Sequence, residues 1–296
     1  MVSNPTTQDD WTVHALNIHG VFFERRCAEE VAAVAEWQIV STNYPVEYPP
    51  PNGPWRGNES SLDIRARKQL PNDEILDVQI ECKKANPEFV NWVFFPKRSN
   101  STSMPFRTMA SRNDMPESGA GQWTTTAFMQ AGTAETLVST DCREVRGDYL
   151  SQKGSNKTKT SNASIQEAAY QVALANRAVV HEDGMLLNRA RGSAQHASPP
   201  WSKKTYIPLI VTTARLYKVS FSASDVALST GEIPLAGVTL EPVQSALYEY
   251  PLPKHLQHTP ADPLPALSGV EIESFTRMDI IVVQADHLAD FIRTLR

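Results

Sequence analysis

The chain has 296 residues, of which 41% are hydrophobic and 21% charged, enough apolar material for a sizeable core in one large domain or two smaller ones. Its formal net charge of -5 argues against non-specific coating of nucleic acid, although an acidic protein can still carry a local basic patch. The three cysteines form no CxxC pair, and no apolar run approaches the roughly 20 residues of a membrane span. We therefore expect no disulfide framework, no zinc site and a cytoplasmic location.

The first third of the sequence predicts a helix followed by four closely spaced strands. Apolar residues recur at the helical period between Trp11 and Glu36. Runs rich in β-branched and aromatic residues then predict the strands, with "PND" at 71–73 as a turn before the third. The four runs are "WQIVSTNYPVEY" (37–48), "ESSLDIRARKQL" (59–70), "EILDVQIECKKA" (74–85) and "NWVFFPK" (91–97).

Residues 98–164 are dominated by Ser, Thr, Asn and Gly, which predicts a loop-rich insertion with little regular structure. A helix follows over 164–180, with Ser164 as its cap and Glu167 three residues later, and it should cover one face of the sheet.

The most apolar run, "YIPLIVTTARLYKVSF" (206–221), predicts one central strand with Pro208 near its start. A proline-rich stretch covers 251–269, and a last strand runs into a helix capped by Asp286. Together these elements predict an α/β fold, a mixed central sheet flanked by helices, in a single domain spanning 1–296.

A pair of charges on the third strand raises the question of function. Side chains alternate along a strand, so Glu81 and Lys83 share one face while Ile80 and Cys82 take the other. Removing these two charges from water costs roughly several kcal/mol per ion. A favourable interaction should therefore compensate for their burial. A Mg²⁺ ion would do so, because it prefers carboxylate, carbonyl and water oxygens. Asp63 on the preceding strand and the backbone carbonyl of Cys82 are the natural additional ligands.

These residues resemble the PD-(D/E)XK nuclease superfamily, which has the restriction-endonuclease-like fold. The first acidic residue of the family motif corresponds to Asp63 in "SLDIRAR", and the ExK element corresponds to Glu81 and Lys83 in "IECKKA". Many members also carry a glutamate on the first helix, and Glu24 stands at that place. The resemblance covers about Trp11 to Lys97, and it departs from the family pattern where Leu62 replaces a proline.

The resemblance implies a Mg²⁺-dependent nuclease that hydrolyses DNA with a metal-activated water, with Mn²⁺ as a substitute ion. Asp63, Glu81 and the Cys82 carbonyl would bind the metal, Lys83 would serve the nucleophile or the transition state, and Glu24 would hold a metal-bound water or support a second metal. Nucleic acid is then the expected partner, and a homodimer is compatible with the sequence. The lysines expected to contact the nucleic-acid backbone are Lys84, Lys203 and Lys204.

Simpler interpretations stay open. Glu81 and Lys83 could be an exposed cross-strand pair on an edge strand, and Asp63 could be a surface acid paired with Arg65. The lysines of "WSKKTY" could protect a strand edge. The chain could also be a catalytically inactive nucleic-acid-binding or scaffold protein that retains the nuclease fold. Neither DNA versus RNA, nor endo versus exo cleavage, nor sequence specificity follows from these residues.

Overall fold

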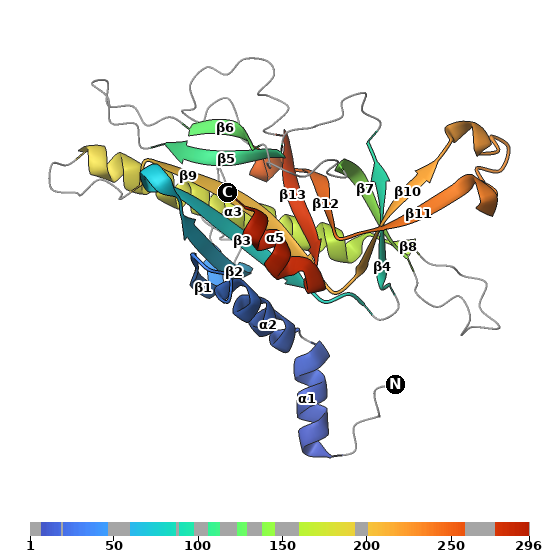
Figure 1. Cartoon of the computed structure of the whole chain (residues 1–296), viewed down its shortest axis with the longest axis horizontal. Helices are drawn as coiled ribbons and strands as arrows, with labels where there is room; N and C mark the ends of the chain where they lie inside the picture. Colours follow the sequence, from blue (N-terminus) through green and yellow to red (C-terminus); the bar gives the residue numbers. More distant parts are fainter. Residues whose placement is uncertain are drawn as a thin grey trace.

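A mixed β-sheet with helices on both faces organises the protein (Figure 1). The computed structural model describes residues 7–18, 20–46, 60–86, 89–97, 106–112, 123–128, 138–145, 160–192, 201–257 and 276–295. The main path through the sheet has the strand order β1-β2-β3-β9-β13-β12-β7-β4-β10-β11. The expected α/β class, with a mixed sheet flanked by helices, is therefore confirmed.

Two helices stand where the sequence predicted one. They are α1 (Gln8–Ile18) and α2 (Val21–Ala32), and Gly20 between them has a φ of 79°. That left-handed conformation suits glycine and interrupts the helical hydrogen bonding, so a single helix from Trp11 to Glu36 was wrong. Helix α2 still buries Cys27 and Val31 against the sheet, as their periodic spacing indicates.

The next three predicted strands form an antiparallel meander. They are β1 (Trp37–Val46), β2 (Ser60–Gln69) and β3 (Glu74–Lys83), and the short 3₁₀ turn η1 (Pro71–Asp73) joins the last two. The fourth predicted strand, β4 (Asn91–Pro96), is also present, but it pairs with β7 and β10 rather than with β3. Strand β3 instead lies between β2 and β9, in the interior of the sheet.

The expectation that 98–164 holds little regular structure was wrong for its described residues. Strand β7 runs inside the sheet between β12 and β4, and β5 joins the sheet beside β9. Strand-forming residues such as those of "WTTTAF" are present in these segments, but the surrounding Ser, Asn and Gly mask them in the sequence, and pairing with distant strands fixes their conformation. The four strands are β5 (Phe106–Arg112), β6 (Trp123–Phe128), β7 (Val138–Val145) and β8 (Thr160–Ser161).

Helix α3 (Ala163–Gly192) lies on one face of the sheet, over β2, β3 and β9. It leads into β9 (Lys203–Thr212), which pairs in parallel with β3 along its whole length. The expected cap of this helix was wrong: the Ser164 hydroxyl donates to Glu144 of β7, and the Glu144 carboxylate also accepts the N–H of Ile165, both at 2.9 Å. A buried carboxylate from another strand thus satisfies the start of α3.

The apolar run 206–221 forms two strands rather than one. It divides between β9 and β10 (Arg215–Phe221), which lie in different parts of the sheet. Pro208 sits in the middle of β9, not near its start. On that side of β9, pairing with β5 ends at Tyr206 and pairing with β13 begins at Leu209. The proline therefore occupies the gap between two partners, where a missing N–H costs little.

The remaining elements complete the second half of the sheet and its last helix. Helix α5 follows β13 as predicted, but Asp286 is not its cap, because His287 takes that position and makes no capping side-chain hydrogen bond. Most of the proline-rich stretch lies outside the described residues. The elements are η2 (Ala223–Asp225), η3 (Leu235–Gly237), β11 (Val238–Val243), β12 (Ser245–Pro251), η4 (Lys254–Leu256), β13 (Arg277–Gln284), η5 (Ala285–His287) and α5 (Leu288–Thr294).

The described residues form one large apolar cluster on each face of the sheet and a small third cluster of Val179, Val180 and Tyr206. Helix α3 packs on one face through residues such as Ile165 and Val172, and α2 and α5 pack on the other through Val31 and Ile292. Among the described helices, none has both the length and the apolar character to cross a bilayer. Strand β3 contacts both helical layers, α3 on one face and α2 on the other.

Candidate active site on strands β2 and β3

The structure brings Asp63 and the ExK triplet together. In the β2–β3 register Ile64 pairs with Ile80, so Asp63 and Glu81 are the next residues outward on the two strands. One carboxylate oxygen of Asp63 accepts the backbone N–H of Cys82 at 2.7 Å, which joins Asp63 to the residue between Glu81 and Lys83. The antiparallel pairing expected from the sequence is thus present, and it fixes Asp63 at the triplet.

Glu81 is buried without a hydrogen-bond partner for one of its oxygens. The residue is only 5% exposed, and Oε2 has no partner among the described residues. Burial raises the pKa of its carboxyl from 4.5 to about 9, and the neighbouring charge of Asp63 adds to the effect while Lys83 opposes it. In the absence of a cation, Glu81 is therefore protonated at neutral pH.

Asp63 and Glu24 complete a group of carboxylates that influence one another. Burial raises the pKa of Asp63 to about 6, the Cys82 N–H lowers it, and the charge of Glu24 raises it. Glu24 stands in the first turn of α2, and burial also raises its pKa. Glu24 acts on Glu81 in the same direction. The three acids singled out in the sequence therefore belong to one electrostatic cluster, in which Glu24 raises the pKa of Asp63 and both of these acids raise the pKa of Glu81.

Lys83 is held by a residue that the sequence did not assign to the site. Its ammonium donates to the carboxylate of Glu167, near the start of α3. The sequence interpretation had used Glu167 only as part of a helix cap. No local pattern marks Glu167 as a site residue, because its position depends on α3 lying across β3, a contact between residues far apart in the chain.

The donor set suits Mg²⁺ better than a metal that requires several protein ligands. Among the described residues no three His, Cys, Asp or Glu side chains are arranged to hold a metal ion on their own. Mg²⁺ is usually held by one or two carboxylates and keeps several waters. Asp63, Glu81 and the Cys82 carbonyl could provide such a set, because Oε2 of Glu81 makes no hydrogen bond among the described residues.

The simpler interpretations of these residues were wrong. Strand β3 is interior and Glu81 is buried, so Glu81 and Lys83 are not an exposed pair on an edge strand. Asp63 does not pair with Arg65, because Arg65 turns to Asp77, with Nε 3.0 Å from one carboxylate oxygen. The charges at the end of β3 therefore need another explanation.

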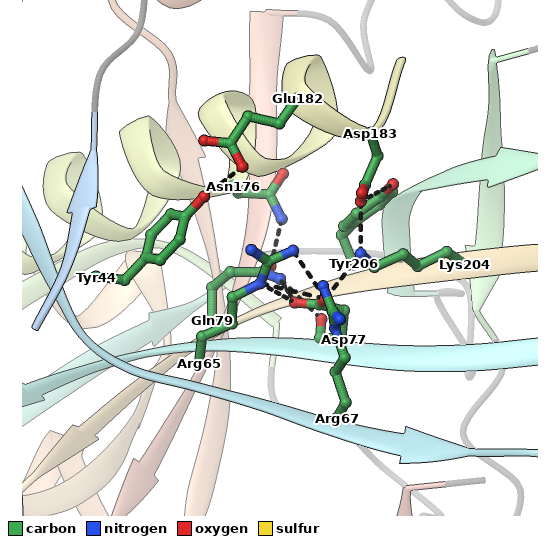
Figure 2. A network of polar contacts seen from close by, with 10 residues as sticks. All are labelled: Tyr44, Arg65, Arg67, Asp77, Gln79, Asn176, Glu182, Asp183, Lys204 and Tyr206. Carbon is green, nitrogen blue, oxygen red and sulfur yellow. Dashed lines mark hydrogen bonds and ion pairs between the residues drawn. The ribbon is translucent and has the colours of Figure 1, made fainter. Parts of the chain in front are cut away.

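A second polar cluster lies beside this site, between the sheet and α3 (Figure 2). The carboxylate of Asp77 is fully buried and lies within 3.0 Å of both Arg65 Nε and Lys204 Nζ. Burial alone would raise the pKa of Asp77, but these cations outweigh it and lower the pKa to about 2. Gln79 links Asp77 to Asn176 of α3 through hydrogen bonds of 2.6 and 2.9 Å. This cluster pairs its charges internally, which indicates a structural role.

The three lysines expected at a nucleic-acid surface differ in their surroundings. Lys204 is 1% exposed and forms ion pairs with Asp77 and Asp183, so its assignment as a phosphate contact was wrong. Lys203 is partly exposed and pairs with Glu74 at 3.1 Å. Lys84 is exposed and donates to the carbonyl of Asn17 at 2.7 Å, close to the ExK triplet in sequence. Lys203 and Lys84 stay predictions.

The chain was also compared with known proteins. No protein-family model, no curated protein and no solved structure matches it. The chemistry of the site is therefore inferred from the residues that form it.

Proposed function

We propose that the protein is a Mg²⁺-dependent phosphodiesterase that hydrolyses DNA, and that its fold is restriction-endonuclease-like. The observation that carries the proposal is the buried carboxylate of Glu81, which has an unpartnered oxygen beside Asp63 on an interior strand. Perturbed carboxyl groups of this kind are concentrated at functional sites.

The energetic argument is that these residues are costly for a merely structural strand. Raising the pKa of Glu81 to about 9 means that its charged form is strongly destabilised in the folded chain. Valine or isoleucine at the same position would fill the space without that cost. The contrast with Asp77 is informative. The buried Asp77 is neutralised by three cations, whereas the strongest neighbouring charge that acts on Glu81 is another acid. A bound divalent cation would give Glu81 the compensating positive charge that Asp77 already has.

Each residue then has a role in hydrolysis. When bound, the cation would polarise the scissile phosphate and make a water molecule more acidic. Asp63 and Glu81 would hold that cation as carboxylates, with the Cys82 carbonyl as a neutral ligand. Lys83, whose side chain is 22% exposed, orients the attacking water or stabilises the charge that develops on the phosphate. Glu24 would hold a water of the cation or support a second cation.

The order of elements supports the same assignment. Helix α2 precedes the meander β1-β2-β3, which carries Asp63 on its second strand and the ExK triplet on its third. This is the order that the sequence resemblance implies. The strand that pairs with β3 on its other side is β9, which comes after α3 in the chain, rather than β4, the next strand in sequence.

The test is cleavage of defined nucleic acids by the purified protein. Plasmid, linear, branched and single-stranded DNA, together with an RNA arm, are incubated with Mg²⁺, Mn²⁺ or EDTA. We expect cation-dependent cleavage of DNA that falls at least about a hundredfold in Asp63→Asn and Glu81→Ala. Glu241→Gln, which breaks the exposed pair with Lys218 on β10 and β11, is the matched control and should cleave normally.

Two outcomes would contradict the proposal. Equal cleavage by wild type and Glu81→Ala would show that the activity does not belong to this site. Cation binding that depends on Asp63, without cleavage of any substrate, would instead favour the inactive nucleic-acid-binding protein.

A further inference from the structure

The contact between Lys83 and Glu167 determines where the lysine of the candidate site points. Lys83 and Glu81 extend from the same face of β3, and Oε2 of Glu81 lacks a partner among the described residues. The Lys83 ammonium nevertheless binds Glu167 on α3. Lys83 therefore pairs with the charged carboxylate of Glu167 rather than with the protonated carboxyl of Glu81.

The first turn of α3 is firmly attached to the sheet, which gives Glu167 a defined position. Glu144, 1% exposed on β7, accepts hydrogen bonds from the Ser164 hydroxyl and the Ile165 N–H. Gln166 donates to the hydroxyl of Tyr248 on β12 at 2.6 Å. The three residues before Glu167 are thus bonded to two different strands, and Glu167 follows them on a fixed helical turn.

We propose that Glu167 is a positioning residue that holds the Lys83 ammonium on the α3 side of the cluster, away from Glu81. This inference rests on the proposed function. With Lys83 held there, the carboxylates of Glu81 and Asp63 are left for a cation, and the lysine stays charged beside it. Without Glu167 the ammonium turns toward the carboxyl groups of Glu81 and Asp63, favours their ionised forms and competes with the cation for them.

The test is a double-mutant cycle on cation affinity. Mn²⁺ binding is measured by calorimetry for wild type, Glu167→Ala, Lys83→Met and the double variant. We expect Glu167→Ala to weaken the Kd about three- to tenfold, a range typical of contacting charged pairs, and to change it less than about twofold when Lys83 is already absent. Glu167→Gln keeps an oxygen that accepts from Lys83 but loses the negative charge, so its Kd should lie between those of wild type and Glu167→Ala. Glu241→Gln serves again as the control for loss of an exposed acid.

The outcomes separate this inference from the proposed function. Equal weakening by Glu167→Ala with and without Lys83 would overturn it, since Glu167 would then act on the cation directly. A Glu167→Gln variant as weak as Glu167→Ala would overturn it as well. If wild type binds Mn²⁺ in a manner that Asp63→Asn abolishes and the cycle is additive, only the positioning role fails. If wild type shows no such binding, both fail.

Discussion

Replacing Glu81 with glutamine should make the metal-free protein more stable at neutral pH. Glutamine has nearly the shape of a protonated glutamate and never ionises. Burial and Asp63 hold the pKa of Glu81 at about 9 in the folded chain, against 4.5 as its ordinary value. Because folding raises this pKa, the contribution of Glu81 to the free energy of unfolding is fully present below pH 4.5 and is lost as the pH rises toward 9.

The magnitude follows from these two values. A pH of 7.5 lies about three units above the ordinary pKa of Glu81. At this pH Glu81 is ionised in the unfolded chain but still protonated in the folded chain. One pKa unit corresponds to about 1.4 kcal/mol, so the full effect is on the order of 4 kcal/mol. Water that enters on ionisation reduces this amount, and we expect Glu81→Gln to raise the free energy of unfolding by about 2–4 kcal/mol at pH 7.5.

The assay is urea denaturation of both proteins between pH 4 and pH 9 in EDTA, followed by circular dichroism. The difference between them should be near zero at the acid end and should grow with pH. Glu249→Gln is the matched control, because Glu249 is also buried but lies 3.1 Å from Lys97 and 3.3 Å from Arg277. That variant should lose about 1–3 kcal/mol. A Glu81→Gln variant that is destabilised at pH 7.5, or whose effect does not depend on pH, would refute the reasoning.

Three further predictions follow from the same contacts. Mn²⁺ binding at pH 7.5 should release about one proton per ion from Glu81, measured by calorimetry in buffers of different ionisation enthalpy; zero release would mean that Glu81 is not a ligand. Asp77→Asn should lower the free energy of unfolding by about 3–5 kcal/mol, because two buried cations lose their carboxylate partner. Its control is Asp290→Asn, at an exposed ion pair, which should cost less than about 1 kcal/mol. Glu144→Ala should cost about 1–2 kcal/mol through the lost start of α3, and an unchanged denaturation midpoint would argue against that capping role.

The local parts of the fold were predictable because local patterns determine them. The alternation of apolar residues and the turn at 71–73 are sufficient to define β2 and β3 as a hairpin, and this hairpin alone brings Asp63 to the triplet. The break at Gly20 was missed because the apolar period continues on both sides of it. The two strands within 206–221 were missed for a similar reason, since a continuous apolar run does not show where a chain changes partners.

The parts that could not be predicted depend on residues distant in sequence. The sequence suggested that Lys204 is a surface lysine, yet it is buried and forms ion pairs with Asp77 and Asp183. Glu144 was in a stretch expected to be irregular, and its role depends on β7 joining the sheet beside β4. Glu167 reaches Lys83 only because α3 crosses β3. In each case a charge is satisfied by a partner that no local pattern indicates.

The central claim, that Asp63 and Glu81 hold a divalent cation, is tested most directly by crystals soaked in Mn²⁺. Anomalous diffraction at the manganese edge locates the ion without reference to activity. We predict one strong peak in contact with the carboxylates of Asp63 and Glu81, absent in a soaked Glu81→Gln crystal. Manganese density elsewhere in the molecule, with none between these two side chains, would contradict the account.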